Sequence, residues 1–304
     1  MRLNNLKKRI LRKIKFNDLR NKSKKLNLLY KILIRRKLNL FDIGAGQRIL
    51  PEFMNFDGIS KIYLIDPNKN INYSYNQLKK YFQDHGNIFK FQTAISDKTS
   101  TKNYYESKIS TISTFSVNKK NKQKISKLYY PNPKKINLYS FKDFLKNHKL
   151  SKPDMVKIDV EGLEFKVLNS VLSCSLPLII QIEANTNNSI FDQSFDLINK
   201  LLIKKGYLLY SLFPSYGDKA FGSNLKTNFI NINLEDIETN FKKQYLLQAE
   251  CFYIRKKKVY SLNDFLLFSG FGLTSFYLEQ LEKSKNKFNK FTKEKLYKVY
   301  NIIK

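Results

Sequence analysis

The sequence is poor in several residue types that mark particular classes of protein. It has no tryptophan and two cysteines, Cys174 and Cys251, which lie in separate apolar segments. There is neither a Cys-x-x-Cys spacing nor a cluster of Cys and His, so neither a zinc site nor a disulfide framework is expected. We interpret both cysteines as small buried side chains.

The sequence also lacks a hydrophobic run that could cross a bilayer. No stretch of about 18 apolar residues occurs. The N-terminal residues are basic, but they lack the apolar core of a signal peptide. We therefore expect a cytoplasmic protein without a membrane span.

Acidic residues and arginine are scarce beside lysine. The 304 residues include 56 Lys and Arg but only 25 Asp and Glu, which gives a net charge of +31, and 8 of the basic residues are arginine. Arginine is preferred for bidentate phosphate recognition, so its scarcity makes a nucleic-acid partner the less favoured reading. The lysine excess fits an AT-rich genome, although a basic field also attracts an anionic membrane or glycan.

The N-terminal segment is the most basic part of the chain. Residues 1–37 carry 15 Lys or Arg and one acid, Asp18. Apolar residues at helical spacing, such as Ile10 and Ile14, predict amphipathic helices. These helices either pack on the domain with a solvated basic face or lie in an anionic membrane interface. The second alternative places the protein at the inner face of the membrane.

The rest of the chain alternates strand-like and helix-like segments, which predicts an α/β fold. We expect a doubly wound, mostly parallel Rossmann-like sheet that ends in an antiparallel strand. Tyr207–Phe213 and Glu250–Arg255 are the expected antiparallel pair, and residues 88–95 are expected to form the third strand. We divide the chain into a basic helical extension (1–37), a central domain (38–258) and a C-terminal helical extension (259–304).

The first strand ends in a glycine-rich turn, Asp42-Ile-Gly44-Ala-Gly46. The glycines allow a tight turn and a close approach to a ligand. Asp66 follows the second strand at the place of a ribose-binding acid. A dinucleotide site needs a third glycine where Ile49 stands, so S-adenosylmethionine fits better, with Asp42 near its cationic amino-acid tail. A plain strand–turn–helix is the alternative.

A second group of polar residues lies at the ends of two later strands. Lys157, Asp159 and Glu161 alternate along the chain, so an extended backbone places them on one face. Gln181, Glu183 and Asn185 do the same on the next strand. Ligands of open α/β sheets bind beyond the carboxyl ends of the strands, so we expect the chemical centre there.

These motifs resemble those of the FkbM-type methyltransferases. The segments that carry the resemblance are Asp42-Ile-Gly-Ala-Gly-Gln, Ile65-Asp-Pro-Asn68, Ala94-Ile-Ser-Asp97, Lys157-Ile-Asp-Val-Glu-Gly-x-Glu164 and Ile182-Glu183. The resemblance covers residues 38–255. It implies a class I fold that binds S-adenosylmethionine, with Asp42, Gly44, Gly46, Asp66 and Asp97 at the cofactor. The family often has Asn in place of Gly46 and Gly in place of Arg48.

The resemblance also implies O-methylation of a sugar, glycan or other hydroxylated natural product. Asp159 is the expected base, with Lys157 holding it ionised and Glu161 orienting the substrate or acting as base itself. Alternatively, Asp159, Glu183 and Asn185 could hold Mg²⁺, which would acidify the acceptor oxygen. Two other functions stay open: an RNA or protein methyltransferase, and a non-catalytic membrane-associated protein with a degenerate cofactor loop.

Overall fold

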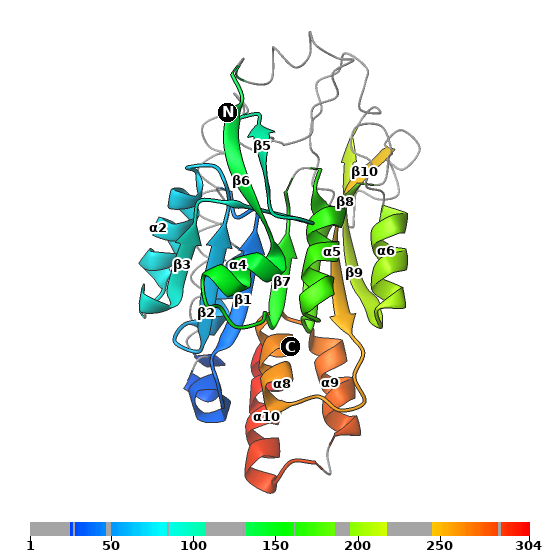
Figure 1. The fold of residues 1–304 in the computed structure, drawn as a ribbon. Coiled ribbons are helices and arrows are strands. Elements are labelled where there is room, and N and C mark those ends of the chain that lie inside the picture. The colour runs from blue at the N-terminus through cyan, green and yellow to red at the C-terminus, as the bar shows by residue number, and fades with distance from the viewer. Residues whose placement is uncertain are drawn as a thin grey trace, which may run out of the picture.

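The computed structural model describes residues 25–26, 28–46, 50–83, 85–106, 130, 132–160, 162–185, 195–217, 245–284 and 287–304. A seven-stranded sheet lies at its centre (Figure 1). In spatial order the strands are β3 (Ile88–Phe91), β2 (Ser60–Ile65), β1 (Leu38–Ile43), β7 (Met155–Ile158), β8 (Ile179–Asn185), β10 (Tyr245–Arg255) and β9 (Tyr207–Gly217).

The pairing within this sheet confirms the predicted fold class. The strands β3, β2, β1, β7 and β8 are parallel to one another, whereas β10 is antiparallel to both of its neighbours, β8 and β9. Two central strands, β1 (LNLFDI) and β7 (MVKI), are buried along their whole length. Their mostly apolar sequences fit this central place. Parallel strands covered on both faces are expected to be apolar throughout.

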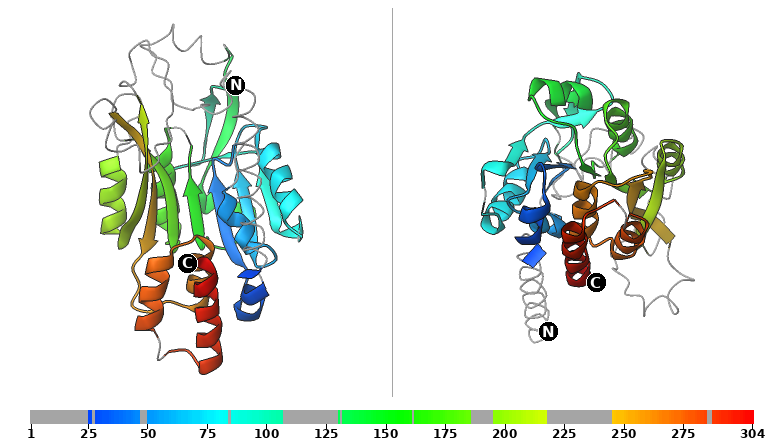
Figure 2. Two further views of the ribbon diagram at one scale, coloured as in Figure 1. Left: turned by 180° about the vertical axis from the view of Figure 1, so that it is seen from behind. Right: turned by 90° about the horizontal axis from the view of Figure 1, so that it is seen from below.

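Helices cover both faces of the sheet (Figures 1 and 2). Alternate residues of β1 enter two separate cores, as the period of a strand requires. Phe41 and Ile43 pack in a core with the helices α4 (Phe141–Asn147), α5 (Glu164–Cys174) and α6 (Phe195–Lys204). Leu38 and Leu40 pack in the other core, with α2 (Ile71–Tyr81) and the 3-10 helix η1 (Pro51–Phe56).

The prediction of one continuous strand over residues 88–95 is wrong. The chain leaves the main sheet after β3 through a tight turn in which the Thr93 amide donates to the Phe91 carbonyl at 2.9 Å. It then forms β4 (Ala94–Ser96), which pairs with β6 (Lys134–Ser140) in a smaller sheet that also contains β5 (Ser100–Tyr104). The short 3-10 helix η2 (His85–Asn87) precedes β3.

Helices from both ends of the chain pack together beneath the amino ends of the parallel strands. They are the N-terminal helix, of which residues 28–33 are the continuous part, and α8 (Leu262–Gly270), α9 (Thr274–Lys283) and α10 (Lys290–Ile303). The hydroxyls of Tyr30 and Ser269 lie 2.6 Å apart. A Cβ on Gly270 would lie 2.0 Å from the Phe56 ring, so this glycine permits the close packing of η1 on α8.

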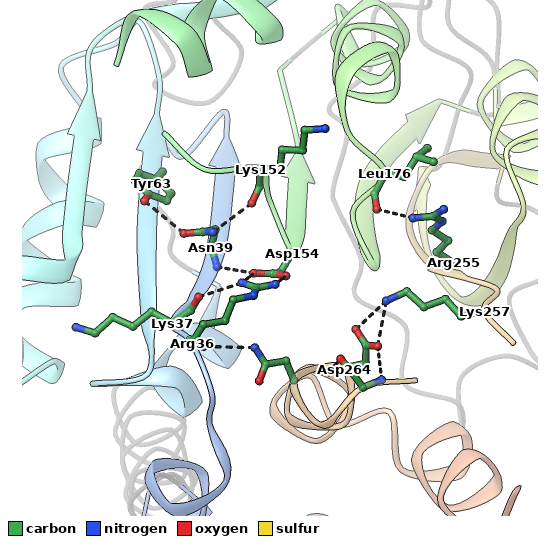
Figure 3. Close-up of polar contacts among 12 residues, drawn as sticks. Arg36, Lys37, Asn39, Tyr63, Lys152, Asp154, Leu176, Arg255, Lys257 and Asp264 are labelled. Atoms are coloured by element: carbon green, nitrogen blue, oxygen red, sulfur yellow. Dashed lines mark hydrogen bonds and ion pairs between the residues drawn. The ribbon is translucent and has the colours of Figure 1, made fainter. Parts of the chain in front are cut away.

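A polar network ties the same end of the sheet together (Figure 3). The Arg36 guanidinium donates to both carboxylate oxygens of Asp154, at 2.7 and 2.5 Å. Asp154 also accepts from the Asn39 amide at 2.9 Å. Nearby, Lys257 pairs with Asp264 at 3.0 Å. The segment before β1 is thereby joined to the segment before β7.

The fold bears on two of the sequence-based predictions, the absence of a membrane span and the N-terminal helices. In the described part of the chain no helix has the length and apolarity to cross a bilayer. The helices predicted before residue 25 lie outside the described residues. Leu26, Tyr30 and Leu33 are buried in the same core as α8 and α10, so this part of the N-terminal segment packs on the domain.

Candidate active site

The glycine-rich turn after β1 passes very close to the end of β7. Gly44 has a φ of +88°, and a Cβ there would lie 1.6 Å from the Asp159 carbonyl oxygen. The Asp159 amide donates to the Ile43 carbonyl at 2.9 Å. Only glycine fits this position, both for its backbone conformation and for its space. The turn that follows β1 therefore lies directly against the acidic end of β7.

Asp66 holds the second half of this turn. Its carboxylate accepts hydrogen bonds from the amides of Gly46 at 2.9 Å and Asn68 at 2.7 Å. Burial raises the pKa of Asp66 to about 6. The two bonds use one lone pair on each oxygen, so both oxygens can accept a further hydrogen bond. Asp66 thus shapes the loop and keeps acceptor capacity for a ligand.

Ser74 on α2 supports the same turn and was not predicted from the sequence. Its hydroxyl lies 3.0 Å from the carbonyls of both Ala45 and Gly46. The sequence indicates only that Ser74 lies on the buried face of α2, with Ile71 and Leu78. It does not indicate that the hydroxyl contacts the turn.

Lys157 joins the two acidic strand ends. The register pairs it with Asp42 on β1, and its ammonium lies 2.8 Å from Asp159 and 3.5 Å from Asp42. Burial would lower the pKa of Lys157, but the carboxylates of Asp159 and Asp42 outweigh burial and raise it. A lysine held charged in this way fixes the Asp159 carboxylate in place.

Asp42 is fully buried, and burial raises its pKa. Neither of its carboxylate oxygens has a hydrogen-bond partner among the described residues. The Lys157 ammonium, 3.5 Å from Asp42 Oδ1, offsets part of the charge, but a buried acceptor that lacks a hydrogen bond is still costly. The chemistry of this position therefore fits a cationic or hydrogen-bonding group of a ligand. Residues 47–49, which follow the turn, lie outside the described residues.

Three further predicted residues lie in different settings. Asp97 is exposed at the end of β4 and accepts from the Ser96 hydroxyl at 2.9 Å, and no contact in the described residues joins it to Asp42 or Asp66. Glu161 lies outside the described residues. Glu164 is buried at the start of α5, where both carboxylate oxygens lie 3.0 Å from the Gly162 amide, as expected for a residue at a helix start.

The acids of the neighbouring strands lie beside the Lys157 cluster, because Gln181 on β8 pairs in register with Lys157 and the charge of Glu250 helps to raise the pKa of Lys157 and of Asp42. Glu183 on β8 lies opposite Glu250 on β10, and the Gln181 amide donates to the Glu250 carboxylate. Among the described residues no three acidic, His or Cys side chains are placed to hold a metal ion. The side chain of Asn185 lies outside the described part, so the Mg²⁺ alternative with Asp159, Glu183 and Asn185 stays a prediction.

Solved structures with a similar fold include several methyltransferases. The chain is 15% identical to methyltransferase FkbM from Methylobacillus flagellatus KT, with a TM-score of 0.40, covering 72% of this chain but only 43% of that one. It is 14% identical to a precorrin-6y C5,15-methyltransferase from Geobacter metallireducens GS-15 (TM-score 0.37; 75% and 85% covered). It is 15% identical to M. capricolum TrmK, solved with S-adenosyl-homocysteine (TM-score 0.34; 92% and 94% covered).

The family assignment rests on sequence. No match is found among curated proteins. Residues 42–209 match the family model of the methyltransferase FkbM domain. This stretch is more than half of the chain and includes the turn after β1, Asp66 and the Lys157–Asp159 pair. The chain therefore belongs to the FkbM methyltransferase domain family.

Proposed function

We propose that the chain transfers a methyl group from S-adenosylmethionine to a hydroxyl of a sugar, glycan or other hydroxylated natural product. The observation that carries the proposal is the buried ammonium of Lys157 between Asp42 and Asp159. It couples a carboxylate behind the glycine-rich turn to a carboxylate that is partly open to solvent. A cofactor side and an acceptor side thus meet at one lysine.

The residues that would hold the cofactor are Asp42, Gly44, Gly46, Asp66 and Asp97. Gly46 supports this reading because, among the described residues, a Cβ there would meet no atom closer than the Gly44 carbonyl oxygen at 3.8 Å. The spare acceptor capacity of Asp66 suits ribose hydroxyls. When bound, S-adenosylmethionine would supply a methyl group on a sulfonium, whose sulfur leaves as a neutral thioether when the methyl group is transferred.

Asp159 is the residue that we assign to the acceptor. Its side chain is 36% exposed, whereas that of Lys157 is 9% exposed. The acceptor hydroxyl can therefore approach Asp159 from solvent, and Asp159 takes the proton that the oxygen loses as it forms the new bond to carbon. Lys157, whose ammonium donates to the Asp159 carboxylate at 2.8 Å, orients Asp159. Holding the acceptor in line can contribute roughly 7–11 kcal/mol to lowering the barrier.

The Asp159→Asn variant tests this assignment. The amide keeps the shape of the side chain but cannot accept the proton, so we expect turnover to fall by roughly 100- to 10,000-fold with S-adenosylmethionine affinity nearly unchanged. Transfer of labelled methyl to a panel of sugars and polyols measures turnover, and calorimetric titration measures affinity. Treatment with mild alkali then identifies the product. A methyl ether, formed at a hydroxyl, is stable to it, whereas a methyl ester, formed at a carboxylate, is hydrolysed.

Asp196→Asn is the matched control, because Asp196 is exposed on α6 and is not part of the site. This control should retain wild-type turnover. Asp159→Asn activity within a few-fold of wild type would contradict the role of Asp159 as base. A labelled product that mild alkali releases would contradict O-methylation of a hydroxyl.

A further inference from the structure

Within residues 25–304 the excess positive charge is concentrated in two segments, at the start and at the end of this range. Residues 25–37 and 256–304 together carry 16 Lys or Arg and 4 Asp or Glu, a net charge of +12 in 62 residues. The 218 residues between them carry a net charge of only +10. Genome composition alone would spread the excess evenly. Because these two segments share one core beneath the sheet, they form one basic face, which we call the basal face.

A groove of about 580 Å³ lies on the basal face, between the amino end of β9, the loop after β10 and α9. Five lysines line it: Lys256, Lys257, Lys258, Lys283 and Lys287. Two of them are neutralised within the chain, because Lys257 pairs with Asp264 and Lys283 pairs with Glu279. The other three have no carboxylate partner in the described residues, so the groove has a net positive charge to offer an anion.

Exposed apolar side chains accompany these charges. Val259, directly after Lys256–Lys258, is 53% exposed. Leu28 and Ile32 on the N-terminal helix are 67% and 52% exposed, and Phe291 on α10 is 57% exposed. The N-terminal helix and α10 lie together at the end of the molecule seen from below in Figure 2. Apolar side chains interspersed with lysine are the pattern of surfaces that enter a headgroup region.

We propose that the basal face docks on a bilayer that contains anionic phospholipids. Lys256, Lys258 and Lys287 would take lipid phosphates in the groove, while Val259 and Phe291 enter the boundary of the acyl chains. The groove is less suited to single-stranded RNA, whose bases stack on exposed aromatic faces. The rings next to the lysines, Tyr260 and Phe276, are only 5% and 8% exposed.

This docking would give the protein a defined orientation. The basal face lies at the amino ends of the parallel strands, and the candidate active site lies at their carboxyl ends (Figure 1). The site would then face away from the bilayer, so the acceptor would reach it from the aqueous side. The docking itself does not depend on methyl transfer and can be tested without a substrate.

The test is sedimentation of the full chain with vesicles of phosphatidylcholine, with and without phosphatidylserine. We expect binding only to the anionic vesicles. Lys256→Glu/Lys258→Glu/Lys287→Glu should weaken it at least about 100-fold, because each basic residue at an anionic membrane is worth roughly five-fold. Val259→Ser/Phe291→Ser, which leaves the charge unchanged, should also weaken binding.

The matched control is Lys200→Glu/Lys204→Glu/Lys205→Glu. It makes the same change in net charge at exposed lysines on and just after α6, and it should bind anionic vesicles nearly as well as wild type. Equal losses in the two triple variants would overturn the proposal in favour of a diffuse charge effect. Full binding by the basal variant, or tighter binding of single-stranded RNA than of the anionic vesicles by wild type, would also overturn it. Circular dichroism confirms folding of each variant.

Discussion

Lys157 is the residue on which the candidate site depends. A buried lysine is costly unless its charge is paired, and here two carboxylates from two strands supply the pairing. The pairing of Lys157 with Asp159 was predicted from their alternation along the chain and is confirmed. The contact of Lys157 with Asp42 was not predicted, because it depends on β1 and β7 being neighbours in the sheet. The contact of Ser74 with the turn could not be predicted, since nothing in a helical sequence tells which loop the helix faces.

Gly44→Ala is predicted to disrupt the turn between these residues. A Cβ 1.6 Å from the Asp159 carbonyl oxygen forces the backbones apart, and φ of +88° is unfavourable for alanine. We expect a loss of at least about 3 kcal/mol in the free energy of unfolding, measured by urea denaturation, and loss of cofactor binding. Gly46→Ala, with φ +41° and an ordinary contact of 3.8 Å to the Gly44 carbonyl oxygen, should cost only about 1–2 kcal/mol. Similar losses in both variants would contradict the close approach.

Glu164 should make the stability of the protein depend on pH. Burial raises its pKa to about 7 from 4.5, so the folded state binds more protons than the unfolded state between these values. The stabilising contribution is therefore present at low pH and is lost as the pH rises from about 4.5 to 7. Glu164→Gln removes this titration.

Relative to wild type, the free energy of unfolding of Glu164→Gln should therefore rise by up to about 3 kcal/mol between pH 4.5 and 8. Urea denaturation at several pH values measures it. A constant difference between the two proteins across this range would show that Glu164 is not the group that titrates.

At the scale of elements, local signals were sufficient in some places and misleading in others. The start of helix α4 has a clear local signal, because Ser140 caps it and accepts from the Asp143 amide at 3.1 Å. The predicted strand over residues 88–95 failed because its β-prone residues continue through a turn at Gln92 and Thr93. A pattern of side chains does not reveal that the backbone has passed to a second sheet.

The link between the segments before β1 and β7 gives a prediction at this scale. Asp154 is 15% exposed and accepts three hydrogen bonds, two from Arg36 and one from the Asn39 amide. Asp154→Ala leaves the Asn39 amide without its carboxylate partner, so we expect a loss of about 2–3 kcal/mol on urea denaturation. Arg36→Ala removes only the side chain that is 56% exposed, and it should cost about 1 kcal/mol or less. The reverse order of losses would contradict this role for Asp154.

At the scale of the whole molecule, the terminal helices complete the core of the domain. Phe265 and Phe268 of α8 and Leu296 of α10 are buried with Leu38 and Leu40 of β1. Their amphipathic patterns were recognisable in the sequence, but the partner of an amphipathic face is set by the tertiary fold. The same packing brings the basic N- and C-terminal segments to one end of the protein, away from the candidate site.

The candidate cofactor site also exists only in the whole fold, because the turn after β1 is held by Asp66 after β2 and by Ser74 on α2. The most direct test of the account is a calorimetric titration of the full chain with S-adenosylmethionine at pH 8, where Asp66, with a pKa of about 6, is ionised. We predict saturable binding with one cofactor per chain, weakened at least about ten-fold in Asp42→Asn, which removes the buried charge. Absence of binding to the folded wild-type protein, or equal affinity in Asp42→Asn, would contradict the account.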